Sequence, residues 1–189
     1  MANIFIIHGS FGNPDENWFP WLKVELEKLG NRVFVPKFPT PENQSLDSWK
    51  NVFSDYEKYL DKNSIVVGHS LGPAFLLNVL SGLNKPIKAS FFVAGFINLL
   101  DNATFDTINK TFVDRSFDWR TIKQNCTKFY LYHSDDDPYV PTSEAEKLSE
   151  KLGVSSLLVK GAGHFNKKAG FDKFDLLLDN IKCELTAID

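Results

Sequence analysis

Cysteine is scarce in this chain: Cys126 and Cys183 are the only two among its 189 residues. They are far apart and form no C-x-x-C pair or Cys/His cluster, the patterns typical of zinc sites and redox motifs. A chain of this length also buries enough surface on folding to be stable without a disulfide or a structural metal. We therefore expect reduced cysteines and no metal site.

Long apolar runs are missing as well. The longest nearly apolar segment, Ala89 to Leu100, is too short to span a bilayer and is interrupted by polar residues and glycine. Met1 is followed directly by the strand-like segment Asn3–Ile7, without the basic region and cleavage site of a secretory leader. We expect a soluble protein with no membrane association, located in the cytoplasm.

An excess of positive charge is also absent. The chain has 21 lysine and arginine residues against 24 acidic ones, a net charge of −3, and no basic run. Binding to a phosphate backbone needs a concentrated positive face, so we expect no nucleic-acid partner. The loop after the first apolar run reads Gly9-Ser10-Phe11-Gly12, which is neither a dinucleotide fingerprint nor a P-loop. We expect no cofactor.

What the chain does contain is a regular alternation of short apolar runs and amphipathic segments. The apolar runs, rich in β-branched and aromatic residues, predict six strands: Ile4–Ile7, Arg32–Val35, Ser64–Val67, Ala89–Ala94, Lys128–Tyr132 and Ser156–Lys160. The amphipathic segments predict five helices: Trp18–Leu29, Leu46–Leu60, Gly72–Leu80, Ser143–Leu152 and Phe171–Leu185. This alternation predicts one doubly wound α/β domain over residues 1–189, with a mostly parallel sheet in the order 2-1-3-4-5-6 and helices on both faces.

One connection is longer than a simple crossover. Residues 96–127 separate the fourth and fifth predicted strands and contain Phe105, Phe112, Phe117 and Trp119. Loops this long are usually functional, so we expect a lid-like insertion whose aromatic residues either pack against the core or line a ligand pocket. A lid of this length covers only a shallow cleft.

The first chemical motif follows the third predicted strand. Gly68-His69-Ser70-Leu71-Gly72 is a G-x-S-x-G sequence between a strand and a helix, the context in which a serine hydroxyl projects from a tight turn. The start of the next helix offers backbone N–H groups and a positive dipole end to a developing oxyanion. This motif predicts that Ser70 is a nucleophile.

A serine nucleophile needs a base within hydrogen-bond reach. All four histidines, His8, His69, His133 and His164, follow or end predicted strands, and the carboxyl ends of parallel strands meet at one edge of the sheet. His164 is the preferred base, because its loop, Gly161 to Phe165, has the flexibility to bring an imidazole over the turn. His133 is the competing candidate.

The base in turn needs a carboxylate to orient it. In hydrolases with this serine motif the acid lies between the nucleophile and the histidine, where Asp135, Asp136 and Asp137 follow the fifth predicted strand. Asp137 is preferred, because Pro138 disfavours helical torsions in the residue before it. Asp135 and Asp136 remain alternatives.

The serine motif, the Asp137–Pro141 run and the Gly161–Phe165 loop resemble those of the α/β-hydrolase superfamily. The small size narrows the resemblance to the compact serine hydrolases grouped with retinoblastoma-binding protein nine and the bacterial YdeN proteins. It extends over essentially the whole chain. It implies a triad of Ser70, Asp137 and His164 that hydrolyses small esters or amides through an acyl-enzyme intermediate, without a cofactor.

The same resemblance implies an oxyanion hole. One donor would be the backbone N–H of Leu71, and the other the N–H of Ser10 or Phe11 in the loop after the first strand. Two other functions are compatible with these residues: a binding or scaffold protein that keeps a hydrolase fold without turnover, and an acyltransferase that uses the same triad. The expected ligand is a small acyl ester or amide. The shallow cleft under the insertion at residues 96–127 favours short acyl groups over long-chain lipids, and its aromatic residues either pack against the core or line the acyl pocket.

Overall fold

The computed structural model describes residues 1–187 of the chain. Its centre is a six-stranded sheet in the order β2-β1-β3-β4-β5-β6, and every neighbouring pair is parallel. The strands are β1 (Asn3–Ile7), β2 (Arg32–Phe34), β3 (Ile65–His69), β4 (Ile87–Val93), β5 (Cys126–Ser134) and β6 (Ser156–Val159). The predicted strand order and the doubly wound α/β fold are confirmed.

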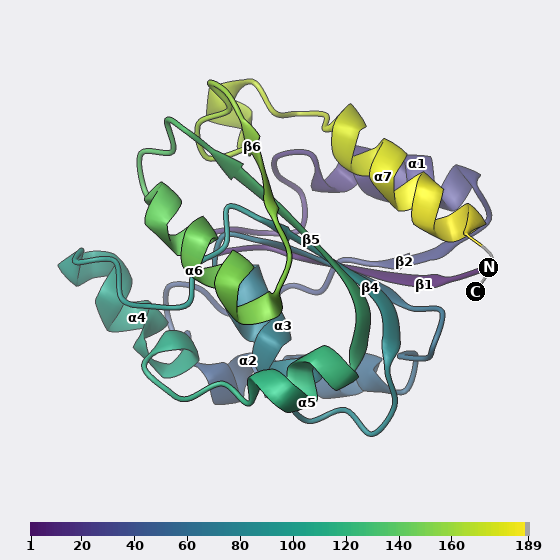
Figure 1. Ribbon diagram of the computed structural model, residues 1–189, viewed down its shortest axis with the longest axis horizontal. Coiled ribbons are helices and arrows are strands. Elements are labelled where there is room, and N and C mark those ends of the chain that lie inside the picture. Colours follow the sequence, from purple (N-terminus) through teal and green to yellow (C-terminus); the bar gives the residue numbers. More distant parts are fainter. Residues whose placement is uncertain (188–189) are drawn as a thin grey trace.

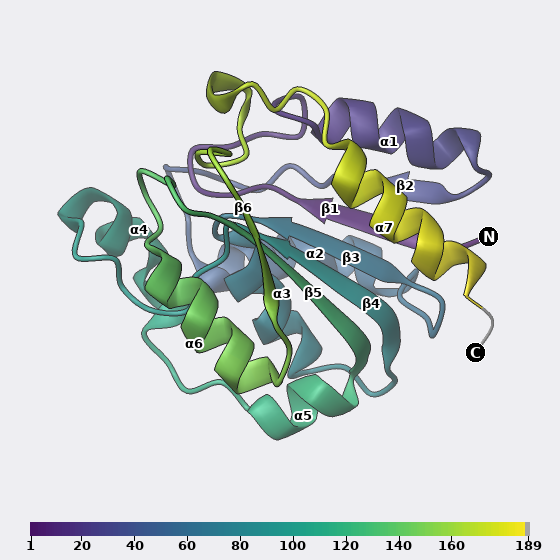
Figure 2. The same cartoon turned by 45° about the horizontal axis from the view of Figure 1, so that its top comes forward.

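Helices cover both faces of the sheet (Figures 1 and 2). One face carries α1 (Phe19–Lys28) and α7 (Asp175–Thr186). The other face carries α2 (Leu46–Glu57), α3 (Gly72–Leu80), α4 (Ala103–Val113), α5 (Trp119–Gln124) and α6 (Thr142–Leu152). No helix within residues 1–187 is long and apolar enough to cross a membrane.

Each face of the sheet has its own hydrophobic core. Successive side chains of a strand point to opposite faces, so Val66 of β3 joins the cluster beneath α2 and α3. Its neighbours Ile65 and Val67 join the cluster beneath α1 and α7. All five residues of β3 are buried, because helices cover both faces of this central strand. The carboxyl end of β3 is therefore a rigid base for the residues that follow it.

The last helix begins later than predicted. The sequence pattern predicts a helix from Phe171, whereas α7 starts at Asp175. Phe171 and Phe174 instead pack against Phe165, with ring centroids 5.1 Å and 5.2 Å from it, and this contact holds the preceding segment in an irregular conformation. Tertiary packing of the two rings outweighs the local helical periodicity here.

The long connection after β4 contains the helices α4 and α5, which the sequence pattern does not predict. The side chain of Asn102 caps α4 by accepting hydrogen bonds from two backbone N–H groups of its first turn. The side chain of Asp118 caps α5 by accepting a hydrogen bond from the backbone N–H of Thr121. Strand β5 begins at Cys126, so the last two residues of the segment 96–127 belong to the sheet.

Helix α4 is anchored to the body of the protein. Phe112 is fully buried, and its carbonyl oxygen accepts a hydrogen bond of 3.1 Å from Asn78 of α3. The hydroxyl of Thr111 accepts a hydrogen bond of 3.0 Å from the backbone N–H of Leu46. These contacts fix the carboxyl-terminal half of α4.

A buried carboxylate holds the chain just before α4. Glu144 of α6 accepts hydrogen bonds of 3.0 Å from the backbone N–H of Ile97 and from the side chain of Asn98, and it pairs with Lys147 at 2.7 Å. Burial alone would raise the pKa of Glu144, but these hydrogen bonds and the ion pair outweigh burial and lower it. The carboxylate therefore stays charged and ties this segment to α6.

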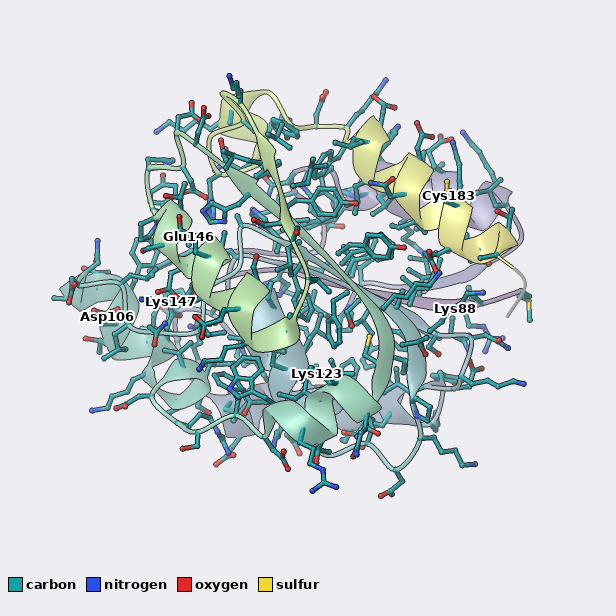
Figure 3. All side chains as sticks on the ribbon, in the orientation of Figure 1. Lys88, Asp106, Lys123, Glu146, Lys147 and Cys183 are labelled. Carbon is teal, nitrogen blue, oxygen red and sulfur yellow. The ribbon has the colours of Figure 1, made fainter. Side chains whose placement is uncertain are left out.

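Both cysteines are free. Cys126 is buried in β5, whereas Cys183 is exposed on α7, at the opposite end of the molecule from Asp106 of α4 (Figure 3). Burial raises the pKa of Cys126 to about 11, so its thiol stays protonated at neutral pH.

Candidate active site

Ser70 lies on the sharp turn between β3 and α3. Its φ of +59° lies in the left-handed region that side-chain-bearing residues rarely adopt. A hydrogen bond of 2.9 Å from its backbone N–H to the carbonyl oxygen of Val93 holds the turn. Helix α3 begins two residues later, at Gly72. The hydroxyl is thereby placed at the carboxyl end of a central strand, beside a helix N-terminus.

Two glycines let the neighbouring backbone come close to this turn. A Cβ on Gly72 would lie 2.6 Å from the carbonyl oxygen of Ile7, so α3 can pack tightly on β1 only with glycine there. A Cβ on Gly9 would lie 2.6 Å from the Cβ of Ser70. Gly9 therefore brings the loop after β1 into contact with the serine.

Asp137 and His164 are joined by a hydrogen bond. The Nδ1 atom of His164 lies 2.8 Å from Oδ2 of Asp137, whose side chain is fully buried. The other oxygen, Oδ1, accepts hydrogen bonds from the backbone N–H groups of Tyr139 (2.9 Å) and Val140 (3.1 Å). The carboxylate is thus fixed on one side by backbone and offers its other oxygen to the imidazole.

The two preceding aspartates bind the backbone of the histidine loop. Asp135 accepts a hydrogen bond of 2.8 Å from the N–H of Gly161, and Asp136 accepts one of 2.7 Å from the N–H of Gly163. Hydrogen bonds from a serine hydroxyl and from Gly163 also lower the pKa of Asp136, so it is charged at neutral pH. The run of three aspartates therefore joins two loops, and Asp137 is the member that contacts the imidazole.

Two other histidines are occupied by backbone groups. His133, the competing base, is buried, and its Nε2 donates a hydrogen bond of 3.0 Å to the carbonyl oxygen of Val140. His8 donates through Nδ1 to the carbonyl oxygen of Gly9 (2.8 Å) and accepts through Nε2 from the N–H of Phe38 (3.1 Å). Burial lowers the pKa of His8, so it is neutral at physiological pH. Both ring nitrogens of His8 are thus occupied, as is Nε2 of His133.

His69, the neighbour of Ser70, connects the serine turn to the histidine loop. Its Nε2 lies 2.8 Å from the backbone carbonyl oxygen of His164, so this nitrogen carries the proton and donates it. The two imidazole rings lie 4.8 Å apart. Burial, together with repulsion from His164, lowers the pKa of His69 to about 3. His69 is therefore a neutral hydrogen-bond donor that holds the backbone of His164.

We expect His69 to make the fold sensitive to acid. The unfolded chain protonates this imidazole as the pH falls below 6.5, whereas the folded protein keeps it neutral down to about pH 3. The unfolded state therefore binds more protons in this window, and the free energy of unfolding falls with decreasing pH by up to about 1.4 kcal/mol per pH unit. Above the window, His69 adds no pH dependence.

Urea unfolding of the wild type and of His69→Gln, followed from about pH 7 to about pH 4, measures this effect. Glutamine does not titrate but keeps an amide N–H for the carbonyl oxygen of His164. The variant should therefore lose less stability on acidification than the wild type. Parallel stability curves for the two proteins would show that His69 does not cause the acid sensitivity.

The backbone N–H groups expected to form the oxyanion hole differ in whether they already donate a hydrogen bond. The N–H of Phe11 donates to the hydroxyl of Thr40 at 2.7 Å and is therefore occupied. Within residues 1–187, the N–H groups of Ser10 and Leu71 donate to no protein acceptor. Of Ser10 and Phe11, Ser10 is thus the residue whose backbone donor is available.

A cavity of about 350 Å³ lies over these groups. Ser10, Ser70 and His164 all line it. Its remaining wall has an apolar part, made of Phe11, Phe96, Leu100, Phe105, Tyr139 and Val140, and a polar part, made of Glu16, Asn17, Asn109, Asn166 and Lys168. Ser70 and His164 are not hydrogen-bonded to each other in the described chain, and catalytic hydrogen bonds of this kind often tighten only when substrate binds.

Several residues of this site carry no sequence motif. Thr40 and Gln44 come from the irregular segment between β2 and α2, and no local pattern distinguishes them. Asn109 lies four residues after Phe105, so the two share a face of α4, but this spacing has meaning only once the helix is recognised. Tyr139 lies inside the aspartate–proline run and could have been singled out there.

The sequence is similar to a family of serine hydrolases and to individual proteins described as hydrolases. Residues 4–182 match the sequence profile of a family described as serine hydrolase. The YdeN protein of Bacillus subtilis (strain 168) is 30% identical over 178 residues, which cover 93% of this chain and 92% of that protein. The serine hydrolase RBBP9 of Rattus norvegicus is 24% identical over 170 residues, which cover 89% of this chain and 87% of that protein.

The fold agrees with that of a solved relative. The crystal structure of the ydeN gene product from B. subtilis superposes with a TM-score of 0.92 and 28% sequence identity. The match covers 99% of this chain and 100% of that one. The similarity therefore extends from the first strand to the last helix.

Proposed function

The chain belongs to the serine hydrolase family, and we propose that it cleaves small carboxylic esters or amides with Ser70 as nucleophile, His164 as general base and Asp137 as the carboxylate that orients it. The observation that carries this proposal is the 2.8 Å hydrogen bond between Asp137 and His164 beside the cavity that Ser70 lines. Family membership supports hydrolysis, and this geometry supports the assignment of roles.

In the first half of the proposed reaction, the Oγ atom of Ser70 attacks the acyl carbonyl carbon. Its proton passes to Nε2 of His164, while Nδ1–H stays hydrogen-bonded to Asp137, which stabilises the imidazolium. The carbonyl oxygen becomes an oxyanion that accepts hydrogen bonds from the free N–H groups of Ser10 and Leu71. Collapse of this tetrahedral species breaks the bond to the leaving group, which takes the proton from Nε2 and leaves an acyl-serine.

In the second half, water enters in place of the leaving group. His164 takes a proton from this water, whose oxygen attacks the acyl-serine carbonyl carbon. The second tetrahedral species collapses to a carboxylic acid, and Ser70 recovers its proton from His164. No group outside the three side chains and the two backbone donors is needed.

The size of the cavity supports a small acyl group. A volume of about 350 Å³ lies near the lower end of the range for ligand pockets. The anchored carboxyl-terminal half of α4 limits how far this wall can move. Among p-nitrophenyl esters of increasing acyl length, kcat/KM should therefore be highest for short acyl groups, and a continuous rise toward palmitate would contradict this.

Labelling with a fluorophosphonate tests the nucleophile directly. The wild type should gain the mass of one phosphonyl group on Ser70, because an activated serine attacks the reagent, and Ser70→Ala should remain unlabelled. A binding or scaffold protein with an inactive hydrolase fold would leave both forms unlabelled. That outcome would overturn the proposal.

An acyltransferase would use the same acyl-serine. The two activities differ in whether water or another acceptor attacks it. Added small alcohols and amines should therefore leave the free carboxylic acid as the main product of the protein. Predominant transfer of the acyl group to such an acceptor would favour the acyltransferase.

A further inference from the structure

One amide in the wall of the active-site cavity has an unused hydrogen-bond donor. Asn109 projects from α4 into this wall and is 2% exposed. A polar side chain buried to this degree normally has partners for both its oxygen and its nitrogen. The partners of Asn109 show which end of the amide faces the cavity.

A backbone carbonyl fixes the orientation of the neighbouring amide. Nε2 of Gln44 lies 3.1 Å from the carbonyl oxygen of Ile108. A carbonyl oxygen only accepts hydrogen bonds, so the atom of Gln44 at this position must be the NH₂ group. The oxygen at the other end of Gln44 accepts from the hydroxyl of Thr40. The orientation of Gln44 is therefore determined by its surroundings.

The orientation of Gln44 in turn determines that of Asn109. The NH₂ group of Gln44 lies 2.8 Å from the near atom of Asn109, which must therefore be the accepting oxygen Oδ1. The hydroxyl of Ser10 donates to the same oxygen at 2.6 Å. Two donors thus occupy Oδ1, and the nitrogen Nδ2 lies at the other end of the amide.

The nitrogen Nδ2 of Asn109 has no hydrogen-bond partner within residues 1–187. This nitrogen is not fully buried, so the NH₂ group is the side of the amide that retains contact with solvent. Asn109 lines the cavity, so we infer that this contact is through the cavity. An NH₂ donor is thereby held ready for a ligand.

Aromatic side chains form another part of the cavity wall. Phe105, one turn earlier on α4, contacts the rings of Phe11 and Tyr139, with centroids 5.8 Å and 5.9 Å away. The backbone of Phe11 has a φ of +59°, which is unfavourable for a bulky residue. Its ring is 49% exposed and therefore gains little free energy from burial. The cavity thus combines a hydrophobic surface with an oriented polar group, and such a combination can select a ligand.

We propose that Asn109 donates a hydrogen bond to an acceptor oxygen on the acyl group of the substrate. The site would then prefer acyl groups with an ether, hydroxyl or keto oxygen over hydrocarbon chains of the same length. This inference rests on the proposed hydrolase function. The backbone donors of Ser10 and Leu71 are available for the oxyanion, which leaves the amide of Asn109 on the neighbouring wall for the rest of the acyl group.

Matched p-nitrophenyl esters test the proposal. Methoxyacetate and butyrate have the same number of heavy atoms and differ by one oxygen, as do 3-methoxypropanoate and pentanoate. For each pair, the ratio of kcat/KM for the oxygenated ester to that for the hydrocarbon ester is measured in the wild type and in Asn109→Asp. Comparing the same ratio in two proteins removes the difference in intrinsic reactivity between the esters.

Asn109→Asp keeps an oxygen for Ser10 and Gln44 but replaces the NH₂ donor by a second oxygen. In at least one pair the ratio should fall by about 5- to 10-fold, the effect of one neutral hydrogen bond. Asn109→Leu, which has a similar shape and no charge, should lower the same ratio. This second variant separates loss of the donor from the effect of a new carboxyl group, and thermal unfolding verifies that both variants fold.

The matched control is Asn102→Asp, the same substitution on the same helix outside the cavity. Aspartate is as good an N-cap as asparagine, so this variant should keep the wild-type ratios. The proposal is wrong if Asn109→Asp and Asn109→Leu keep the wild-type ratio in both pairs of esters. An equal fall of kcat/KM for both members of a pair leaves the ratio unchanged and counts as this outcome. Failure of the proposed function would differ, because no ester would then show hydrolysis that depends on Ser70.

Discussion

Ser70→Ala should lower kcat for a short acyl ester by about 10³- to 10⁶-fold, because the residues of a catalytic triad act as a unit. His164→Ala should cause a loss of similar size, and the double variant should be little worse than either single one. KM is expected to change much less, since the walls of the cavity remain. Steady-state kinetics with p-nitrophenyl acetate measures all three variants.

The control for this prediction is Ser54→Ala, which removes an exposed hydroxyl on α2 and should keep wild-type kcat. His133→Ala serves to test the competing base, provided that the variant remains folded. Loss of activity in folded His133→Ala, with activity retained in His164→Ala, would show that the base is wrongly assigned. Wild-type turnover in Ser70→Ala would rule out the proposed nucleophile.

Asp137→Asn should lower kcat by about 10⁴-fold. The backbone N–H groups of Tyr139 and Val140 donate to Oδ1 of residue 137, so the amide oxygen of asparagine would stay on that side. Its NH₂ group would then face Nδ1 of His164. The imidazole would have to accept at Nδ1 and carry its proton on Nε2, where it could no longer take the proton of Ser70.

The matched control is Asp172→Asn, at an exposed aspartate outside the cavity, and it should retain wild-type kcat. The mechanism also predicts that fluorophosphonate labelling of Ser70 slows in Asp137→Asn, because the serine loses its base. Unchanged labelling together with unchanged kcat would show that the Asp137–His164 hydrogen bond has no catalytic role.

The sheet could be predicted because its signals are local. Each strand is a short apolar run, and alternation with helices determines which elements become neighbours. Helix α3 has the bounds Gly72–Leu80 that its sequence predicts, since the serine turn marks its start. The start of the last helix could not be predicted, because the rings of Phe171 and Phe174 pack on Phe165 and this packing outweighs the helical periodicity.

The candidate site was only partly accessible from sequence. Ser70, Asp137 and His164 lie in short motifs at strand ends. Ser70 and His164 line one cavity, and Asp137 is hydrogen-bonded to His164 behind it. The network around Asn109 could not be anticipated, because it joins residues 65 positions apart in the chain. Its members come from an irregular segment and from a short helix with no motif, so only the folded structure brings them together.

The strand order has a consequence for synthesis of the protein. After β3, each new strand adds to the edge left by the previous one, so the sheet can grow in the direction in which the ribosome delivers the chain. The serine turn follows the third strand, whereas Asp137 and His164 follow the fifth and the sixth. A nascent or truncated chain that ends before β6 therefore carries the serine without the histidine that we propose as its base. The proposed mechanism predicts that this serine becomes reactive only once β6 and the histidine loop have been added.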